Sequence, residues 1–176
     1  DVFIEHVGIP TLGALREAVD SLKELNMHRK VQLIVSGGIR SGADVAKAMA
    51  MGADAVSIGS AAMIALNCNA DMYPEDYEKL GTAAGYCHHC HTGKCPVGVA
   101  TQDPELEKRL EPELAGKRVK NYLATLTLEL QTLARANGKS DVRNLEPEDL
   151  AALTVEAAAM ARVPLAGTNW IPGHEL

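Results

Sequence analysis

The stretch that decides the fold is IVSGGIRSGADVAKAMAMGADAVSIGSA, residues 34–61. Its first residues, together with Val31-Gln32-Leu33 before them, are rich in apolar and β-branched side chains. They predict a strand over residues 31–39 that is buried on both faces, as in a parallel sheet. Residues 41–51 predict a helix that Gly52 stops, and residues 53–60 predict a second strand that leads into another helix. Strands and helices that alternate in this way are typical of a parallel sheet or a barrel.

The segments on either side extend this alternation and then end it. Residues 1–8, DVFIEHVG, predict a further strand, and residues 11–25 carry leucine and valine at helical spacing. Residues 69–117 predict an irregular segment with short helical pieces, which is too long for a bare loop unless something organises it. Three helices are predicted beyond it: one from about Lys117 to Asn137-Gly138, one that begins within residues 146–153, and one over residues 154–162.

The composition is that of a globular protein with a buried core, since 47% of its 176 residues are hydrophobic and 23% are charged. The net charge of −6 argues against nucleic acid or an anionic membrane as the main partner, because both favour clustered lysine and arginine. No apolar run reaches the ~18 residues of a membrane span, and no signal peptide opens the chain. We therefore expect a cytoplasmic protein, in which clustered cysteines more often bind metal than form disulfides. Because a buried strand begins at Asp1, we also expect a piece of a longer chain.

Glycine-rich turns follow both strands of the opening stretch. Ser36-Gly37-Gly38 ends the first strand and Gly59-Ser60 ends the second, and a helix begins after each turn. Glycine lets the backbone approach a phosphate closely, and helix N-termini favour an anion. In (β/α)8 barrels a phosphate site lies on the loops after the last two strands. The two turns therefore predict a phosphate site, and the alternative is that they are only tight turns between strand and helix.

A second informative stretch is AAGYCHHCHTGKCPVGVATQ, residues 83–102, which holds three of the four cysteines. Zinc needs four tetrahedral ligands, and a histidine of this stretch could complete such a set. Iron–sulfur clusters prefer thiolates, often with proline after the last cysteine, and nearby glycines let backbone N–H groups turn toward sulfide. The spacing favours an iron–sulfur cluster over structural zinc, with free thiols as the third alternative. We interpret three residues as loop histidines that shield the site: His88, His89 and His91.

Both stretches resemble the glutamate synthase family. SGGIRSGADVAKAMAMGADAVSIGS is similar to the phosphate-binding end of flavin mononucleotide (FMN) barrels, which include glycolate oxidase-like enzymes and glutamate synthases. CHTGKCPVGVATQDPEL resembles the cluster loop of glutamate synthases, C-H-x-x-x-C-P-V-G-V-A-T-Q-D. The closing NLEPEDLAALTVEAAAMARVPLAGTNWIPG resembles separately encoded flavin subunits, including archaeal-type glutamate synthases and the methylamine–glutamate N-methyltransferase subunit. Glu5 stands where the family has a lysine.

The resemblance implies which residues bind the cofactors. Cys90 and Cys95 match the last two cluster ligands, while Cys68 fits the first by its neighbours (ALNC) and Cys87 fits it by distance. We favour Cys87, since it keeps the cluster within one loop at little cost in closure entropy. The family cluster is 3Fe–4S, and four thiolates also permit 4Fe–4S. The residues implied for FMN, with Arg40 as a charge partner of its phosphate, are Ser36, Gly37, Gly38, Ile39, Arg40, Gly59 and Ser60.

The resemblance also implies a fold and an activity. Residues 1–68 would be the C-terminal half of an FMN-binding (β/α)8 TIM barrel, residues 69–116 a cluster loop, and residues 117–176 a helical C-terminal segment. The parent flavoenzyme would reduce an iminoglutarate, formed from 2-oxoglutarate and ammonia, to L-glutamate. Implied partners are the remaining half of the barrel, in the same chain or a separate one, a glutaminase or amidotransferase, and an electron-donor subunit. The alternatives are a flavin subunit of a methylamine–glutamate N-methyltransferase and a non-enzymatic zinc-stapled module, and the sequence identifies no catalytic residue.

Overall fold

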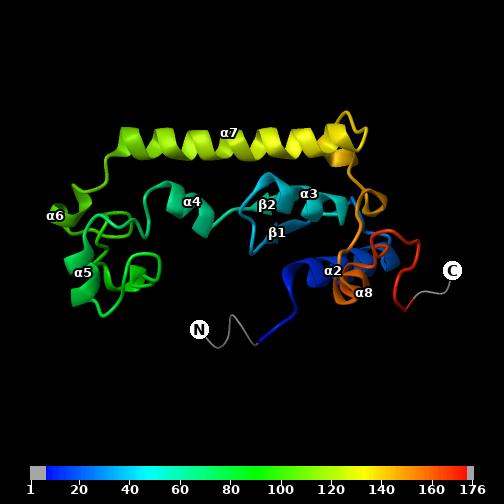
Figure 1. Cartoon of the computed structure of the whole chain (residues 1–176), viewed down its shortest axis with the longest axis horizontal. Coiled ribbons are helices and arrows are strands. Elements are labelled where there is room, and N and C mark those ends of the chain that lie inside the picture. The colour runs from blue at the N-terminus through cyan, green and yellow to red at the C-terminus, as the bar shows by residue number, and fades with distance from the viewer. Residues whose placement is uncertain (1–6, 174–176) are drawn as a thin grey trace. The chain divides into compact units, whose positions relative to one another are not determined.

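The computed structural model describes residues 7–173, so nearly all of the strand predicted over residues 1–8 lies outside the described residues. The chain divides into two compact units (Figure 1). The first unit consists of residues 1–58 and 126–176, and the second consists of residues 59–125. One helix, α7 (Pro112–Ala136), begins in the second unit and ends in the first.

The first unit contains a strand–helix–strand element, as the sequence predicts. Strands β1 (Ile34–Ser36) and β2 (Ala55–Ser57) are parallel neighbours, with Ile34 opposite Ala55 and Ser36 opposite Ser57. Helix α3 (Gly42–Ala50) connects them, within one residue of its predicted bounds at each end. The fold is therefore mixed α/β, with more helix than strand among the described residues.

The strands differ from the prediction in length and in burial. The predicted strand over residues 31–39 pairs only from Ile34 to Ser36, because a strand ends where its partner ends. The prediction that it is buried on both faces is wrong, since Val35 is 7% exposed whereas Ile34 is 64% exposed. Val35 lies on the face that packs toward helices, while Ile34 and Ser36 lie on a face that nothing in the described part of the chain covers.

Helices cover one side of this small sheet. Helix α2 (Thr11–Glu24) buries Leu15 and Val19, and α3 buries an alanine-rich face with Val45. The first turn of α3 packs on α7 so closely that a Cβ on Gly42 would lie 2.4 Å from the carbonyl oxygen of Leu126. The two helices can approach this closely because Gly42 has no side chain.

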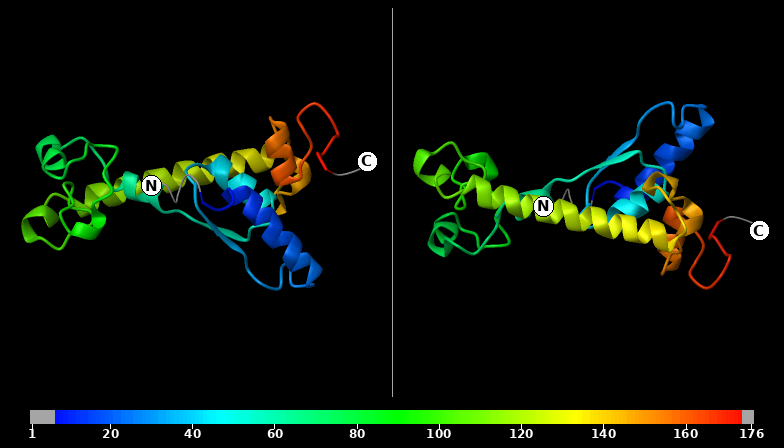
Figure 2. Two further views of the ribbon diagram at one scale, coloured as in Figure 1. Left: turned by 90° about the horizontal axis from the view of Figure 1, so that it is seen from below. Right: turned by 90° about the horizontal axis from the view of Figure 1, so that it is seen from above.

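The C-terminal segment folds back onto α2. Helix α8 (Val155–Ala161) packs against α2, as Figures 1 and 2 show, and Arg162 just after α8 forms an ion pair with Asp20 of α2. Thr154 caps α8 by accepting a hydrogen bond from Ala157 N–H. The helix predicted within residues 146–153 is only a 3-10 turn, η3 (Pro147–Asp149), and the backbone is extended at Leu150, where that turn ends. A second 3-10 turn, η2 (Val142–Asn144), precedes it.

The second unit is irregular with short helical pieces, which confirms the prediction for residues 69–117. Its elements are α4 (Ser60–Ala65), α5 (Pro74–Lys79), the 3-10 turn η1 (Cys90–Thr92), α6 (Pro104–Glu107) and the first part of α7. Its small core consists of Tyr77, Cys95 and Val97. Helix α7 begins at Pro112 rather than near Lys117, because proline is well suited to the first turn of a helix. No helix within residues 7–173 is long and apolar enough to span a membrane.

Candidate functional site

The turn after β1 has the backbone geometry that the phosphate prediction requires. Gly37 and Gly38 have φ angles of +118° and +72°, which glycine adopts at little cost. Within the described residues, no group accepts a hydrogen bond from the N–H of Gly37, Gly38 or Ile39. Three consecutive N–H groups at a glycine turn are a suitable cradle for an anion.

At the start of α3, carboxylates of the protein accept hydrogen bonds from the first backbone N–H groups. Ser41 and Asp44 form a capping box, and the Asp44 carboxylate accepts from the N–H groups of Arg40 and Ser41. Gly42 N–H donates to Glu129 at 2.7 Å. Burial alone would raise the pKa of Asp44, but hydrogen bonds from Arg40 and Ser41 and the charge of Lys47 together lower it. A carboxylate already occupies this helix end.

The other residues predicted for the phosphate site differ in exposure and in position. The Ile39 side chain is buried, so Ile39 could reach a ligand only through its backbone. Arg40 is exposed. Because Ser36 pairs with Ser57, both strands end at the same edge of the sheet, and Gly59 follows β2 by two residues. Gly59 is the N-cap of α4 and Ser60 is the first residue of that helix, and both are exposed in the second unit.

A cavity of about 290 Å³ lies beside the Gly37–Gly38 turn. The first turn of α2, from Pro10 to Gly13, forms one wall, and Met160 of α8 forms another. A Cβ on Gly13 would lie 3.8 Å from the Cβ of Met160. The C-terminal segment therefore borders the predicted cofactor site.

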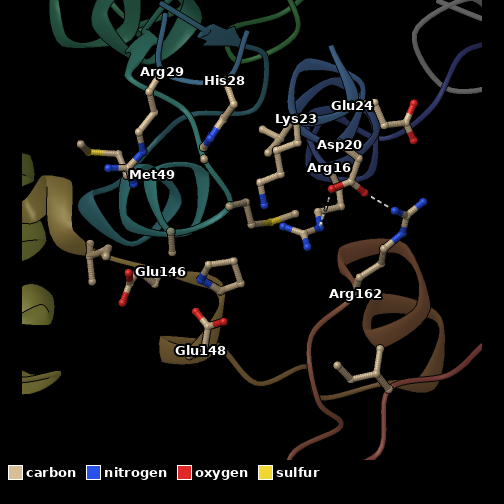
Figure 3. A pocket seen from close by; sticks show the side chains of 17 residues that line it. Arg16, Asp20, Lys23, Glu24, His28, Arg29, Met49, Glu146, Glu148 and Arg162 are labelled. Carbon is tan, nitrogen blue, oxygen red and sulfur yellow. Dashed lines mark hydrogen bonds and ion pairs between the residues drawn. The ribbon is translucent and has the colours of Figure 1, made fainter. Parts of the chain in front are cut away.

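A larger hollow of about 750 Å³ lies elsewhere in the first unit (Figure 3). It is lined by the last residues of α3, Met49 and Ala50, and by Met51 and Gly52 after it, which lead into the beginning of β2 rather than its end. Arg16 and Lys23 of α2 point into it, and Glu148 lies on the opposite wall (Figure 3). Parallel α/β proteins bind their ligands at the carboxyl ends of the strands. This hollow is therefore not the predicted FMN site.

The second unit gathers all four cysteines, and none of them forms a disulfide. Cys95 is buried in the small core, Cys87 packs against that core, and Cys90 is exposed. Burial, followed by the neighbouring thiols of Cys90, Cys95 and Cys87, raises the pKa of Cys68. Cys68 therefore belongs to the same unit as the other three despite its separation in sequence.

Asn69 connects Cys68 with the cysteine segment. Its amide donates to the carbonyl oxygen of Cys87 at 3.2 Å and lies 3.8 Å from the Cys68 sulfur. Its side-chain oxygen accepts from the Cys87 N–H at 2.8 Å. The sequence interpretation missed Asn69. Asparagine tolerates the left-handed backbone found there, but no local pattern predicts its contact with Cys87.

The donor atoms fit a soft metal, but the site is not pre-formed. Among residues 7–173, no three histidine, cysteine or acidic side chains converge closely enough to hold a metal ion. The rings of His88, His89 and His91 stack on each other, with centroids 5.1 and 6.1 Å apart. Cysteine thiolates are the donors that iron–sulfur chemistry uses, so the four thiols would have to move together to hold a cluster.

The cysteine segment is held by contacts from the rest of its unit. The Tyr77 hydroxyl donates to Ala70 O at 3.1 Å, and burial, together with the nearby cysteines, raises the pKa of Tyr77 to about 12. Thr101 donates to the carbonyl of Gly93, and Arg109 donates to that of Pro96. The sequence interpretation placed no role on Arg109, which is one of several charged residues in its helix-forming stretch.

Comparisons with known proteins identify what this chain is similar to. The model of the conserved region in glutamate synthase matches residues 1–140. A glutamate synthase large subunit-like protein of Rhizobium meliloti (strain 1021) is 65% identical over 173 residues, which are 98% of this chain and 39% of that protein. An archaeal glutamate synthase (NADPH) of Methanocaldococcus jannaschii is 42% identical over 144 residues, 82% of this chain and 25% of that protein. A ferredoxin-dependent glutamate synthase of Cyanidium caldarium is 36% identical over 152 residues, 80% of this chain and 8% of that protein.

Proposed function

Because the chain belongs to the glutamate synthase family, we propose that it is part of an oxidoreductase that makes L-glutamate from 2-oxoglutarate and ammonia. The chain spans less than half the length of the relatives that it matches, so the parent protein supplies the rest of the catalytic domain. The observation that carries the proposal is the pairing of Ser36 with Ser57. It ends both strands at one sheet edge, where each is followed within two residues by glycine.

The glycine turns would bind the phosphate of FMN. The N–H groups of Gly37, Gly38 and Ile39 would donate to its oxygens, and Ser36, Arg40, Gly59 and Ser60 complete the proposed set. Their support is the positive φ of both glycines and the absence of another acceptor in the described part of the chain. When bound, FMN supplies a hydride to 2-iminoglutarate, and the cluster supplies electrons one at a time.

The cysteines would bind an iron–sulfur cluster. We propose Cys87, Cys90 and Cys95 as ligands of a 3Fe–4S cluster, with Cys68 as the alternative first ligand or as the fourth ligand of a 4Fe–4S cluster. The support is that one unit gathers these thiols, with Cys95 and Cys87 at its core. Cys95 in the core would shield one side of the cluster from water, which limits its hydrolysis and oxidation.

We infer further that the first unit is the C-terminal half of an FMN-binding (β/α)8 barrel. Its two parallel strands have a crossover helix on one face, which is what neighbouring strands of such a barrel require. The bare face with Ile34 and Ser36 would become the barrel interior. The proposed partners are the remaining half of the barrel, a glutaminase or amidotransferase subunit, and an electron-donor subunit.

Cofactor analysis of the complete parent protein tests this function. Anaerobically purified protein should contain FMN, iron and acid-labile sulfide, and it should show the absorption and EPR signals of a cluster. Gly38→Asp should lose FMN, because a carboxylate about 4 Å from a phosphate costs roughly 4 kcal/mol. Gly138→Asp is the matched control: Gly138 also has a positive φ, +71°, and also has no atom within 4 Å of an added Cβ. Equal FMN content in the two variants would remove the glycine turn from the proposed site.

The amine substrate needs an assay of its own. The match to the large subunit-like protein of Rhizobium meliloti extends beyond residue 140, where the family model ends, and so includes the C-terminal segment that borders the cavity. Methylamine should be tested beside ammonia with the complete set of subunits, because the closing residues also resemble the methylamine–glutamate N-methyltransferase subunit. NADPH and ferredoxin should both be offered, since relatives are named for each. Zinc without sulfide in the purified protein would instead support the zinc-stapled alternative.

A further inference from the structure

We propose that Arg109 is a positioning residue for Cys95, on which it acts through the backbone that follows this cysteine. The inference rests on the proposed cluster site. It adds no ligand to that site, and it assigns to Arg109 the task of holding one ligand in place.

Arg109 contacts three residues, in two separate parts of the second unit. Its Nη1 donates to the carbonyl oxygen of Pro96 at 2.7 Å and to Oδ2 of Asp76 at 2.7 Å. Its guanidinium carbon lies 4.2 Å from the centre of the Tyr73 ring, within the range of a cation–π interaction. Pro96 directly follows Cys95, whereas Tyr73 and Asp76 lie at the start of α5. One side chain therefore ties the backbone at Cys95 to another helix.

These contacts are partly shielded from water. The Arg109 and Asp76 side chains are 25% and 27% exposed, and Pro96 is fully buried. A carbonyl that is shielded from solvent loses more when its donor is removed than an exposed one, because no water replaces the donor. Removing Arg109 would therefore leave the Pro96 carbonyl without a partner.

A close backbone contact fixes Arg109 opposite this carbonyl. Gly98 has a φ of +75°, and a Cβ there would lie 2.5 Å from the carbonyl oxygen of Leu106 and 3.3 Å from the Cβ of Arg109. The turn after Cys95 and the end of α6 are thus packed against each other at Gly98. Arg109 comes directly after this end of the helix, which explains how its side chain reaches back to Pro96.

The core that contains Cys95 is small, so it depends on such a tie. It has three buried residues, Tyr77, Cys95 and Val97. The planar guanidinium can donate in two directions while stacking on a ring, whereas a lysine ammonium cannot stack in this way. Arg109 therefore supplies rigidity that apolar packing at Cys95 does not provide alone.

The test uses the complete parent protein, loaded with iron and sulfide under anaerobic conditions. Arg109→Met should lose iron to a ferrous chelator at least ~10-fold faster than wild type, because a ligand on a loosened backbone leaves the cluster more often. Its EPR signal should broaden at equal iron content, which a general loss of stability does not cause. Arg109→Lys should lose iron at an intermediate rate, since it keeps the charge beside Asp76 but not the stacking on Tyr73.

Lys108→Met is the matched control and should lose iron at the wild-type rate. Lys108 is the neighbouring cation, and within the described residues its one ion pair is with Glu105 on the surface. Should Arg109→Met fail to fold, Asp76→Asn and Tyr73→Leu each remove one contact and should each increase the rate. Wild-type iron loss in Arg109→Met overturns the proposal. If the wild-type protein contains no iron, the proposed cluster site is wrong. In that case the amide hydrogen-exchange rates of residues 97–99 are compared in the metal-free proteins. Faster exchange in Arg109→Met than in wild type supports the role of Arg109, and equal exchange overturns it.

Discussion

At the scale of single residues, Asn69 joins two cysteines that the sequence separates by 18 intervening positions. Asn69→Gly keeps the left-handed backbone, since φ is +61° at this residue, and removes the three side-chain contacts. We expect the unfolding free energy of the parent protein to fall by about 1–2 kcal/mol and its iron content to fall by more than half. Iron analysis and urea denaturation measure the two effects.

Asn67→Gly is the control for this substitution. Asn67 also has a positive φ, +94°, and its side chain contacts Met72 rather than a cysteine. It should retain its iron. Equal iron content in the two variants would show that Asn69 does not place Cys68 near the cysteine segment.

The residues of the candidate site were predictable to different degrees. Cys87, Cys90 and Cys95 could be grouped from sequence because only a few residues separate them. Spacing did not group Cys68 with them, and only the resemblance of its neighbours, ALNC, suggested it, since its approach depends on a contact that forms when the unit folds. The capping box of Ser41 and Asp44 was visible as a local pattern, and the sequence analysis overlooked it.

At the scale of elements, helices were predicted better than strands for a physical reason. The bounds of α3 follow from a local pattern of apolar residues and a cap, so residues 41–51 were close to the observed Gly42–Ala50. The length of β1 depends on its partner, which no local pattern of residues 31–39 contains. The apolar residues of β1 predicted that one face is buried. The exposure of Ile34 on the other face depends on which elements pack there, so it was not predictable from local sequence.

The close packing of α3 on α7 gives a prediction at this scale. Gly42→Ala places a methyl group 2.4 Å from a backbone oxygen of α7, and we expect it to lower the unfolding free energy by about 1–3 kcal/mol. Gly116→Ala is the control, because Gly116 lies within α7 and an added Cβ would meet no atom within 4 Å. That change should raise the unfolding free energy by up to about 1 kcal/mol. Urea midpoints of the parent protein compare the two, and equal midpoints would contradict the close contact.

At the scale of the whole molecule, the small sheet of the first unit carries apolar side chains on a face that the described residues leave exposed. Val35 and Val56 face the helices, whereas Ile34 and Ala55 lie side by side on the exposed face. A solvent-facing strand pair usually carries polar side chains at such positions. An apolar pair there is what the proposed barrel interior requires, since such interiors are filled by branched apolar residues.

Ile34→Lys distinguishes a barrel interior from an ordinary surface. In the isolated 176-residue chain the lysine would lie in water, so the variant should stay dispersed at higher concentrations than wild type, as measured by light scattering. In the complete parent protein the same lysine would be an unpaired buried charge, and we expect the unfolding free energy to fall by about 3–5 kcal/mol. Leu153→Lys is the control, because Leu153 is 87% exposed and lies outside the sheet, so it should change stability by less than about 0.5 kcal/mol in either protein. A parent protein that tolerates Ile34→Lys as well as Leu153→Lys would have an exposed surface at β1, and the proposed barrel would then be wrong.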